Sequence, residues 1–272
     1  MTDRYAVIGN PVAHSRSPEI HAAFARECGA AIQYDRLLAS STGFVQTVEA
    51  FRTGGASGAN VTLPFKLEAF TYANACTSRA ERGKSVNTLR FDKNKIVGDN
   101  TDGVGLCRDI VSNIGQPLRG ARVLLIGAGG AARAVVGALL DCKPENLTIA
   151  NRTAEKAQAI VEEFNAGKVF CTVELTELTS RRFDVLINAT SASLTADLLP
   201  LPGTCFDTNS LAYEMMYGKG LTPFLNLAAS NGARTADGLG MLVEQAAEAF
   251  YLWRGVRPAT GPVLKLLKQP AQ

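Results

Sequence analysis

The chain has 272 residues, of which 46% are hydrophobic and 19% are charged, a balance typical of a globular protein with two domains. Its formal net charge of +3 is too small to indicate a nucleic-acid or membrane-surface partner. Six scattered cysteines without metal-ligand spacing, no apolar run long enough to span a membrane and no signal-peptide pattern predict a cytoplasmic protein with reduced thiols and no bound metal.

Short apolar strands alternate with amphipathic helices in the N-terminal part of the chain. Strands are expected at residues 5–9, from Ala59 up to the proline at position 64, and at 85–89, and helices from Ser17 onward and at 42–52, 68–80 and 104–114. A short hairpin is expected around Asp92-Lys-Asn94. Because strands that alternate with helices usually lie parallel, this part predicts a parallel sheet.

Three polar groups in this region are candidates for a ligand site, and each also has an ordinary structural explanation. Ser17 before Pro18 is typical of an N-cap and first helical residue, and its hydroxyl and that of Ser15 are equally consistent with a carboxylate site. Lys66 follows a strand end, where α/β proteins collect ligand groups, but most lysines are solvated surface residues. The polar cluster that ends at Asp102 is also consistent with a helix cap.

A buried strand, a glycine-rich turn and a helix follow one another in the middle of the chain. Four apolar residues, Val123–Ile126, run directly into glycines, as in a parallel strand buried on both faces. Gly127, Gly129 and Ala132 fit the dinucleotide-binding fingerprint, whose small residues allow a tight turn, a close approach of the pyrophosphate and close helix packing. The helix N-terminus offers N–H groups to the phosphates. This stretch therefore predicts a dinucleotide-binding domain.

The end of the following strand indicates which dinucleotide is bound. The strand at 146–150 ends at Asn151-Arg152-Thr153, and 151 − 127 = 24 residues separate this point from the first glycine. NAD-binding domains carry an acidic residue there, whereas an arginine and a small hydroxyl accommodate the 2′-phosphate of NADP. The sequence therefore predicts NADP (NADPH) as the cofactor.

The C-terminal part predicts how the domains are connected. Buried strands are expected at 184–191 and 210–217, and a long amphipathic helix runs from Leu239 to Trp253 and ends at Gly255 and Pro258. We expect this helix to return to the N-terminal domain. The substrate-binding domain would then be discontinuous, with residues 1–103 and 238–272, around an NADP-binding domain of residues 104–237.

Several stretches from Tyr5 to about Leu267 together resemble the shikimate dehydrogenase family. In chain order they are GNPVAHSRSP, ANVTLPFK, SVNTL, GDNTDGVG, IGAGGAAR, NRT, INATSAS, EMMYGKGLTPFL and DGLGMLVEQAAEAFYLWRG. The resemblance implies an N-terminal α/β substrate domain with a mostly parallel sheet, a Rossmann-type NADP domain and an active site in the cleft between them. It implies reversible NADPH-dependent reduction of 3-dehydroshikimate to shikimate, on the route to chorismate and the aromatic amino acids. We expect a monomer or homodimer with only small-molecule ligands.

The resemblance also assigns roles to individual residues. It makes Lys66 and Asp102 the catalytic pair. It places the substrate carboxylate on Ser15, Ser17 and Thr62, and the ring hydroxyls on Asn87, Asp102 and Gln245. The cofactor residues it implies are Gly127, Gly129, Gly130, Ala131 and Ala132 for the pyrophosphate, Asn151, Arg152, Thr153 and Lys156 for the adenosine 2′-phosphate, and Thr190, Met215, Tyr217 and Gly238 along the adenosine-to-nicotinamide side.

Three positions depart from the family pattern, and two alternative functions stay open. Lys84 stands where glycine is expected, Lys156 where many members have arginine, and Ser193-Leu194 where a small residue commonly follows the NATS motif. One alternative is an NAD-dependent quinate/shikimate dehydrogenase, against which Arg152 argues. The other is a non-catalytic NADP-binding sensor, which would have no use for a proton donor such as Lys66.

Overall fold

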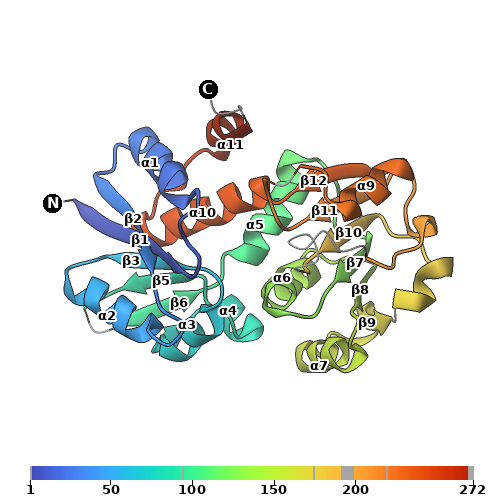
Figure 1. Cartoon of the computed structure of the whole chain (residues 1–272), viewed down its shortest axis with the longest axis horizontal. Helices are drawn as coiled ribbons and strands as arrows, with labels where there is room; N and C mark the ends of the chain where they lie inside the picture. Colours follow the sequence, from blue (N-terminus) through green and yellow to red (C-terminus); the bar gives the residue numbers. More distant parts are fainter. Residues whose placement is uncertain (1, 94, 174, 191–198, 219, 269–272) are drawn as a thin grey trace. The chain divides into compact units, whose positions relative to one another are not determined.

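The computed structural model describes residues 2–93, 95–173, 175–190, 199–218 and 220–268 (Figure 1). Asn94 of the predicted hairpin and the Ser193-Leu194 difference lie outside these residues. The chain forms two compact units: unit 1 comprises Met1–Gly105 with Leu242–Gln272, and unit 2 comprises Leu106–Met241. These divisions lie 105 − 103 = 2 and 241 − 237 = 4 residues beyond the domain boundaries expected from the sequence.

Unit 1 is built on a six-stranded mixed sheet with the strand order β2-β1-β3-β5-β6-β4. Its strands are β1 (Asp3–Gly9), β2 (Ile32–Leu38), β3 (Gly58–Val61), β4 (Ala75–Cys76), β5 (Thr88–Phe91) and β6 (Ile96–Asp99). β1 pairs parallel with β2 and β3, and β4 pairs parallel with β6, whereas β5 pairs antiparallel with β3 and β6. The predicted mostly parallel sheet is confirmed, and β5 is the exception because a tight hairpin joins only antiparallel strands.

Helices pack on both faces of this sheet, as the alternation of side chains along β1 requires. Ala6 and Ile8 belong to the core formed with α2 (Phe44–Thr53), α3 (Lys66–Tyr72) and α4 (Ser78–Gly83). Tyr5 points to the opposite face, where it stacks on Trp253 of α10 (Leu239–Arg254) with ring centroids 4.4 Å apart. The same aromatic cluster includes His21 of α1 (Ser17–Glu27), and α11 (Thr260–Lys268) also contacts α1.

Three local features of unit 1 differ from the prediction. The helix predicted at 68–80 is divided into α3, β4 and α4, because Asn74 Oδ1 accepts the Ile96 N–H at 2.8 Å and Thr77 caps α4. The strand predicted from Ala59 to the proline at position 64 already ends at Val61, and Lys66, which was expected just past the strand, opens α3. The edge strand β2 is absent from the prediction because its exposed and buried residues do not alternate regularly.

Unit 2 is built on a parallel six-stranded sheet with the order β12-β11-β10-β7-β8-β9. Its strands are β7 (Arg122–Ile126), β8 (Asn146–Ala150), β9 (Phe170–Val173), β10 (Val185–Asn188), β11 (Leu211–Glu214) and β12 (Arg234–Asp237). Counted within the unit, this is the 3-2-1-4-5-6 order of nucleotide-binding folds. The order reverses at β7, where such sheets bind their ligands beyond the carboxyl ends of the strands.

Both faces of the unit 2 sheet are covered, which explains the unbroken apolar run of β7. Val123 and Leu125 share a core with α6 (Gly130–Asp141) and α7 (Ala154–Phe164), whereas Leu124 and Ile126 share a core with α9 (Pro223–Ser230). The first core also contains residues of α5 (Asp102–Arg108) and of the π-helical turn Asp109–Asn113 that follows it. In the described part of the chain, no helix combines the length and apolar character needed to cross a membrane.

Candidate active site

Lys66 and Asp102 form an ion pair in unit 1. Each is the first residue of a helix, α3 and α5, and Lys66 Nζ lies 2.6 Å from Asp102 Oδ2. The Lys66 side chain is 23% exposed and the Asp102 side chain 9%. Among the described residues, Asp102 is the one hydrogen-bond partner of Lys66 Nζ. An ammonium carries three N–H donors, so two remain for solvent or a ligand.

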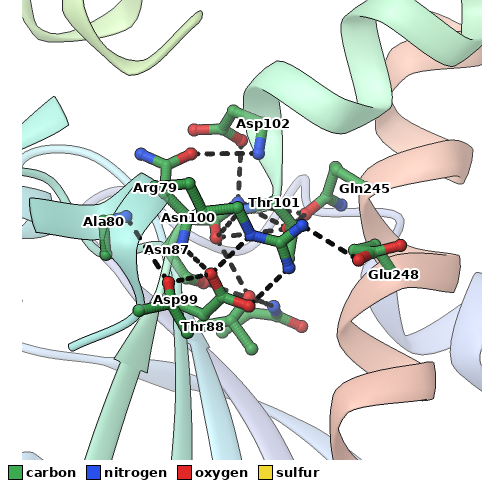
Figure 2. A network of polar contacts seen from close by, with 12 residues as sticks. Arg79, Ala80, Asn87, Thr88, Asp99, Asn100, Thr101, Asp102, Gln245 and Glu248 are labelled. Atoms are coloured by element: carbon green, nitrogen blue, oxygen red, sulfur yellow. Dashed lines mark hydrogen bonds and ion pairs between the residues drawn. The ribbon is translucent and has the colours of Figure 1, made fainter. Parts of the chain in front are cut away.

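Asn87 is the centre of a buried hydrogen-bond network beside this pair (Figure 2). Its amide nitrogen lies 2.8 Å from Asp102 Oδ1, 3.0 Å from Thr101 Oγ1 and 3.3 Å from Gln245 Oε1. Its amide oxygen accepts from the Thr101 N–H at 2.9 Å and from Thr88 Oγ1 at 3.0 Å. Asn87, Asp102 and Gln245, which the resemblance assigned to the substrate, are therefore brought together.

The turn from Asp99 to Asp102 is held by its own side chains. Asp99 Oδ1 accepts the Asn100 N–H at 2.7 Å, and Asn100 Oδ1 accepts the Asp102 N–H at 3.1 Å. Asn100 Nδ2 also donates to the Ser85 carbonyl at 3.1 Å, which ties the turn to the chain before β5. The polar cluster is thus a local scaffold that presents Asp102 at the start of α5.

Ser15 and Ser17 lie together at the beginning of α1. Ser15 Oγ donates to Ser17 Oγ at 3.2 Å and accepts the Ser17 N–H at 3.3 Å. Ser17 is buried and is already helical, and Arg16 occupies the cap position without a side-chain capping bond. Ser17 is therefore the first helical residue and not the N-cap, so the capping interpretation of Ser17 is wrong. Two hydroxyls near a helix N-terminus are suitable donors for an anion.

Tyr34 and Asn60 extend the network toward these serines. Tyr34 OH donates to Asn60 Oδ1 at 2.7 Å, and Asn60 Nδ2 donates to Thr88 Oγ1 at 3.0 Å and to the Asn87 carbonyl at 3.2 Å. Burial raises the pKa of the Tyr34 hydroxyl, and a hydrogen bond with the Ser17 side chain lowers that pKa only in part. Tyr34 lies on β2, a strand that was not predicted from the sequence, so the hydrogen bond between Tyr34 and Asn60 was not predicted either.

Thr62 is half-buried in the turn that follows β3. Its N–H donates to the Ile8 carbonyl at 2.9 Å, which holds the turn against the end of β1. A Cβ at Gly9 would lie 2.3 Å from the Thr62 methyl carbon. Glycine at the end of β1 therefore leaves the space that Thr62 occupies.

The glycine turn of unit 2 has the geometry that a pyrophosphate requires. Gly127 has φ +109°, which is a glycine conformation, and a Cβ there would lie 3.0 Å from Thr190 Cγ2. A Cβ at Gly129 or Gly130 would meet nothing within 4 Å, so the space beside them is open. α6 begins at Gly130 without a side-chain cap, and it carries Ala131 and the buried Ala132 in its first turn. The uncapped N–H groups and the open space fit a bound diphosphate.

The other predicted cofactor residues follow the carboxyl ends of neighbouring strands in unit 2. Thr190 follows β10, donates to Asn188 Oδ1 at 2.7 Å and touches Gly127. Met215 and the half-buried Tyr217 follow β11, and Gly238 follows β12. A Cβ at Gly238 would lie 2.2 Å from the Met215 carbonyl oxygen, so these two segments touch.

The residues predicted for the 2′-phosphate follow β8. Asn151 Nδ2 donates to the Thr153 carbonyl at 2.8 Å, which closes the turn around the exposed Arg152. Arg152 makes no hydrogen bond or ion pair with another described residue. Lys156 is exposed in the first turn of α7. The described residues contain no cluster of His, Cys, Asp or Glu that could hold a metal ion.

Three family models match most of the chain. They are the shikimate dehydrogenase substrate binding domain over residues 7–89, shikimate/quinate 5-dehydrogenase over residues 109–196, and the shikimate 5′-dehydrogenase C-terminal domain over residues 238–268. The first and third matches fall in unit 1, apart from the first residues of the third, and the second falls in unit 2.

Relatives and solved structures agree with these matches. A curated shikimate dehydrogenase (NADP(+)) from Nitrosospira multiformis is 56% identical over 269 residues, which are 98% of each chain. The crystal structure of an Ael1 enzyme from Pseudomonas putida has a TM-score of 0.95 and 48% identity over 100% of both chains. The complex of shikimate 5-dehydrogenase from Thermus thermophilus with NADP(H) and shikimate has a TM-score of 0.86 and 33% identity over 97% of this chain and 98% of that one. The chain therefore belongs to the shikimate dehydrogenase family.

Proposed function

We propose that Lys66 and Asp102 are the catalytic pair of this NADP-dependent shikimate dehydrogenase. The reaction is the reversible reduction of 3-dehydroshikimate to shikimate, on the route to chorismate and the aromatic amino acids. The observation that supports the assignment is the 2.6 Å ion pair, in which a partly exposed ammonium keeps donors for a ligand. A surface lysine with a structural role would not need a buried carboxylate beside it.

The pair supplies what the reduction of a ketone requires. As the carbonyl carbon is reduced, negative charge develops on its oxygen, and the Lys66 ammonium stabilises that charge. Lys66 then gives the oxygen a proton, which makes the hydroxyl, and the neutral amine regains a proton from solvent. In the direction of oxidation, the same amine takes the hydroxyl proton. The nicotinamide, when bound, supplies or accepts the hydride.

Asp102 orients this lysine and contributes to substrate binding. Its Oδ2 accepts from Lys66 and its Oδ1 from Asn87, so the carboxylate is held from two sides. We assign the ring hydroxyls of the substrate to Asn87, Asp102 and Gln245, since the Asn87 amide already donates to each of the other two. Groups of this kind favour a polyol ring, because an analogue without hydroxyls would leave buried polar atoms unpaired.

We assign the substrate carboxylate to Ser15, Ser17 and Thr62. The two serine hydroxyls are 3.2 Å apart beside the N-terminus of α1, where the helix dipole favours negative charge. Both hydroxyls can turn their protons toward a carboxylate, since a serine O–H rotates freely about its C–O bond. All of the residues assigned to the substrate lie in unit 1, and all of those assigned to the cofactor lie in unit 2. We accordingly propose unit 1 as the substrate-binding domain and unit 2 as the NADP-binding domain.

We assign the cofactor to the carboxyl edge of the unit 2 sheet. The diphosphate would contact Gly127, Gly129 and the first turn of α6, and Arg152 would pair with the 2′-phosphate through charge-assisted hydrogen bonds. A cytoplasmic location is our proposal as well, and the six cysteines, all of them free, are consistent with a reducing compartment. A monomer or homodimer with no nucleic-acid partner stays a prediction.

The direct test is the reduction of the cofactor by purified protein with shikimate, quinate or no polyol, each with NADP⁺ and with NAD⁺. We expect turnover with shikimate and NADP⁺ to exceed every other combination. Faster turnover with quinate and NAD⁺ would favour the quinate/shikimate alternative. Binding of NADP⁺ without turnover on any polyol would favour the non-catalytic sensor.

A further inference from the structure

Arg79 of α4 is held by two buried carboxylates at the edge of the Asn87 network (Figure 2). Its Nε lies 2.6 Å from Asp99 Oδ1 and its Nη2 lies 2.5 Å from Asp99 Oδ2, a bidentate pair. Its Nη1 lies 3.0 Å from Glu248 Oε1. Asp99 is 1% exposed and Glu248 is 7% exposed, so Asp99 could not lose this partner without a large cost, whereas Glu248 would keep its contact with Arg257.

The first carboxylate controls the turn that carries Asp102. Asp99 Oδ1 accepts from Arg79 and also from the Asn100 N–H and Thr77 Oγ1, at 2.7 and 2.5 Å. Asn100 in turn accepts the Asp102 N–H at 3.1 Å. A shift of the Asp99 carboxylate would therefore move Asn100, and Asn100 would move the start of α5, where Asp102 contacts Lys66.

The second carboxylate belongs to the helix that carries Gln245. Glu248 is three residues after Gln245 in α10, so the two side chains lie on the same side of that helix. Gln245 Oε1 lies 3.3 Å from Asn87 Nδ2 and 3.3 Å from Thr101 Oγ1. Arg79 thus connects the Asp102 turn to α10, at the two places where the substrate hydroxyl groups would be recognised.

The charge and shape of arginine suit this position. Burial opposes the charge on Arg79, but its hydrogen bonds to Asp99 and the charges of both carboxylates outweigh that effect and raise its pKa. A planar guanidinium can hold one carboxylate with two parallel bonds and reach a second with its remaining nitrogen, which an ammonium cannot do with the same geometry.

We infer that Arg79 is a positioning residue, which aligns Asp102 and Gln245 for the substrate by holding Asp99 and Glu248 together. The inference rests on the proposed roles of Lys66, Asp102 and Gln245. Arg79 itself does not touch Lys66, Asn87 or Asp102 in the structure. Its loss should therefore lower the efficiency of the reaction without removing any reacting group.

Steady-state kinetics with Arg79→Ala test the inference. We expect kcat/KM for shikimate to fall about ten- to hundredfold, with KM raised and kcat lowered, because small displacements of positioned groups have effects of this size. The Kd for NADP⁺ should not change, since the cofactor residues lie in unit 2. Arg257→Ala is the matched control, because Arg257 contacts the same Glu248 at 2.6 Å but not Asp99, and it should keep the wild-type values.

Chemical rescue separates positioning from a general loss of stability. Arg79, Asp99, Glu248 and Tyr251 line an open pocket of about 520 Å³, through which a small cation can reach the position of the guanidinium. Methylguanidinium at non-denaturing concentrations should restore much of the lost kcat/KM in Arg79→Ala and have no effect on the Arg257→Ala control. Arg79→Lys should give intermediate values, and it carries the test if the alanine variant does not fold.

Two results would overturn the inference. The first is an Arg79→Ala variant that folds and keeps the wild-type kcat and KM. The second applies if Arg79→Ala does not fold, and it is an Arg79→Lys variant that keeps the wild-type kcat and KM. Either result with an active wild type and an inactive Lys66 variant would leave the proposed function standing. A wild type without shikimate oxidation, or an active Lys66 variant, would instead refute the proposed function.

Discussion

Each of the two carboxylate oxygens of Asp102 holds a different residue of the candidate site in unit 1. Oδ2 holds Lys66 at 2.6 Å and Oδ1 holds Asn87 at 2.8 Å, so that the residue proposed for proton transfer and a residue proposed for substrate binding are fixed by one carboxylate. Substitution of Asn87 would for that reason disturb Lys66 as well. Effects of mutations within this cluster should not be additive.

We expect the cofactor preference to depend chiefly on Arg152 in unit 2. Arg152 is exposed after β8 and is expected to pair with the 2′-phosphate through charge-assisted hydrogen bonds worth roughly 1.5–3 kcal/mol. At about 1.4 kcal/mol per decade, Arg152→Ala should raise the Kd for NADP⁺ about ten- to hundredfold, whereas the Kd for NAD⁺ should barely change. Fluorescence titration with both cofactors measures this directly.

The exposed Arg119, also in unit 2, provides a control of equal charge change. Arg119→Ala should leave the affinity for both cofactors unaltered. If Arg152→Ala instead weakened NADP⁺ and NAD⁺ equally, Arg152 would have a structural role and the assignment of the 2′-phosphate would be incorrect.

The individual residues of the site were predictable to different degrees. Lys66, Asp102 and the glycines belong to short motifs, in which neighbouring residues specify the local chain path, so their positions could be predicted. Arg79 could not, because its partners are 20 and 169 residues away in the chain and no local pattern connects them. Tyr34 escaped prediction for the same reason, since its hydrogen bond to Asn60 spans 26 residues.

At the scale of single elements, the end of α4 shows why glycine is expected at position 84, where this chain has lysine. Lys84 has φ +44° and ψ +42°, a left-handed conformation, and the Ser85 N–H reaches back to the Ala80 carbonyl at 3.3 Å, as at a helix C-terminus that glycine usually completes. Glycine adopts this conformation without strain, whereas a side chain makes it unfavourable by roughly 1–2 kcal/mol.

Lys84→Gly should therefore increase the free energy of unfolding, by about 0.5–1 kcal/mol, because the greater freedom of glycine in the unfolded chain offsets part of the gain. Urea unfolding followed by the fluorescence of Trp253, the one tryptophan of the chain, reports on unit 1. Lys84→Ala keeps a Cβ and should show no such increase. A glycine variant less stable than the wild type would mean that Lys84 side-chain contacts outweigh the strain.

Elements with a clear local pattern could be predicted, and those interrupted by tertiary contacts could not. The apolar stripe of α10 repeats over several turns, and β7 is an unbroken apolar run that leads into glycines, and both elements occur where expected. The segment 66–83 has the composition of one helix, but Asn74 and Thr77 interrupt it with tertiary and capping hydrogen bonds. The local sequence could not decide between a cap and a carboxylate donor at Ser17 for a similar reason, since only the structure shows where α1 begins.

At the scale of the whole molecule, we propose that unit 1 binds the substrate and unit 2 the cofactor, each at its own sheet. The return of the chain to unit 1 could be predicted, because the long helix after the last strand of unit 2 has an apolar stripe that needs a surface to pack against. α10 finds that surface in unit 1, where Trp253 stacks on Tyr5 and Phe250 lies near Phe24. In the unit 1 sheet, the antiparallel strands β5 and β6 flank the hairpin expected around residues 92–94, whereas the two-residue strand β4 beside β6 was not predictable because it is too short to carry a pattern.

The stability of the molecule should depend on pH through His21. Its imidazole is fully buried, stacks on Tyr34 at 4.3 Å and makes no hydrogen bond of normal geometry with a described residue. Burial lowers its pKa from 6.5 to about 3, and the nearby Asn60 amide opposes this only in part. Below pH 6.5 the unfolded chain binds a proton that the folded chain does not, so stability is full above pH 6.5 and is lost as the pH falls toward 3.

Between pH 7.5 and 5.0 this one group should reduce the free energy of unfolding by about 2 kcal/mol. His21→Phe keeps an aromatic ring but cannot titrate, so the variant should lose about 2 kcal/mol less than the wild type over that interval. Urea midpoints followed by Trp253 fluorescence at both pH values give the comparison. Parallel losses in the two proteins would show that His21 does not contribute to the pH dependence.

The central claim is that Lys66 transfers the proton, and Lys66→Met tests it most directly, because methionine keeps the apolar stem and removes the ammonium. We predict that kcat for shikimate oxidation falls at least a hundredfold, within the range of about 10²–10⁴ for general acid–base groups, while KM for shikimate and the Kd for NADP⁺ change little. The exposed Lys93→Met serves as control and should retain full activity at an unaltered melting temperature. A folded Lys66→Met protein that keeps most of its kcat would contradict the assignment.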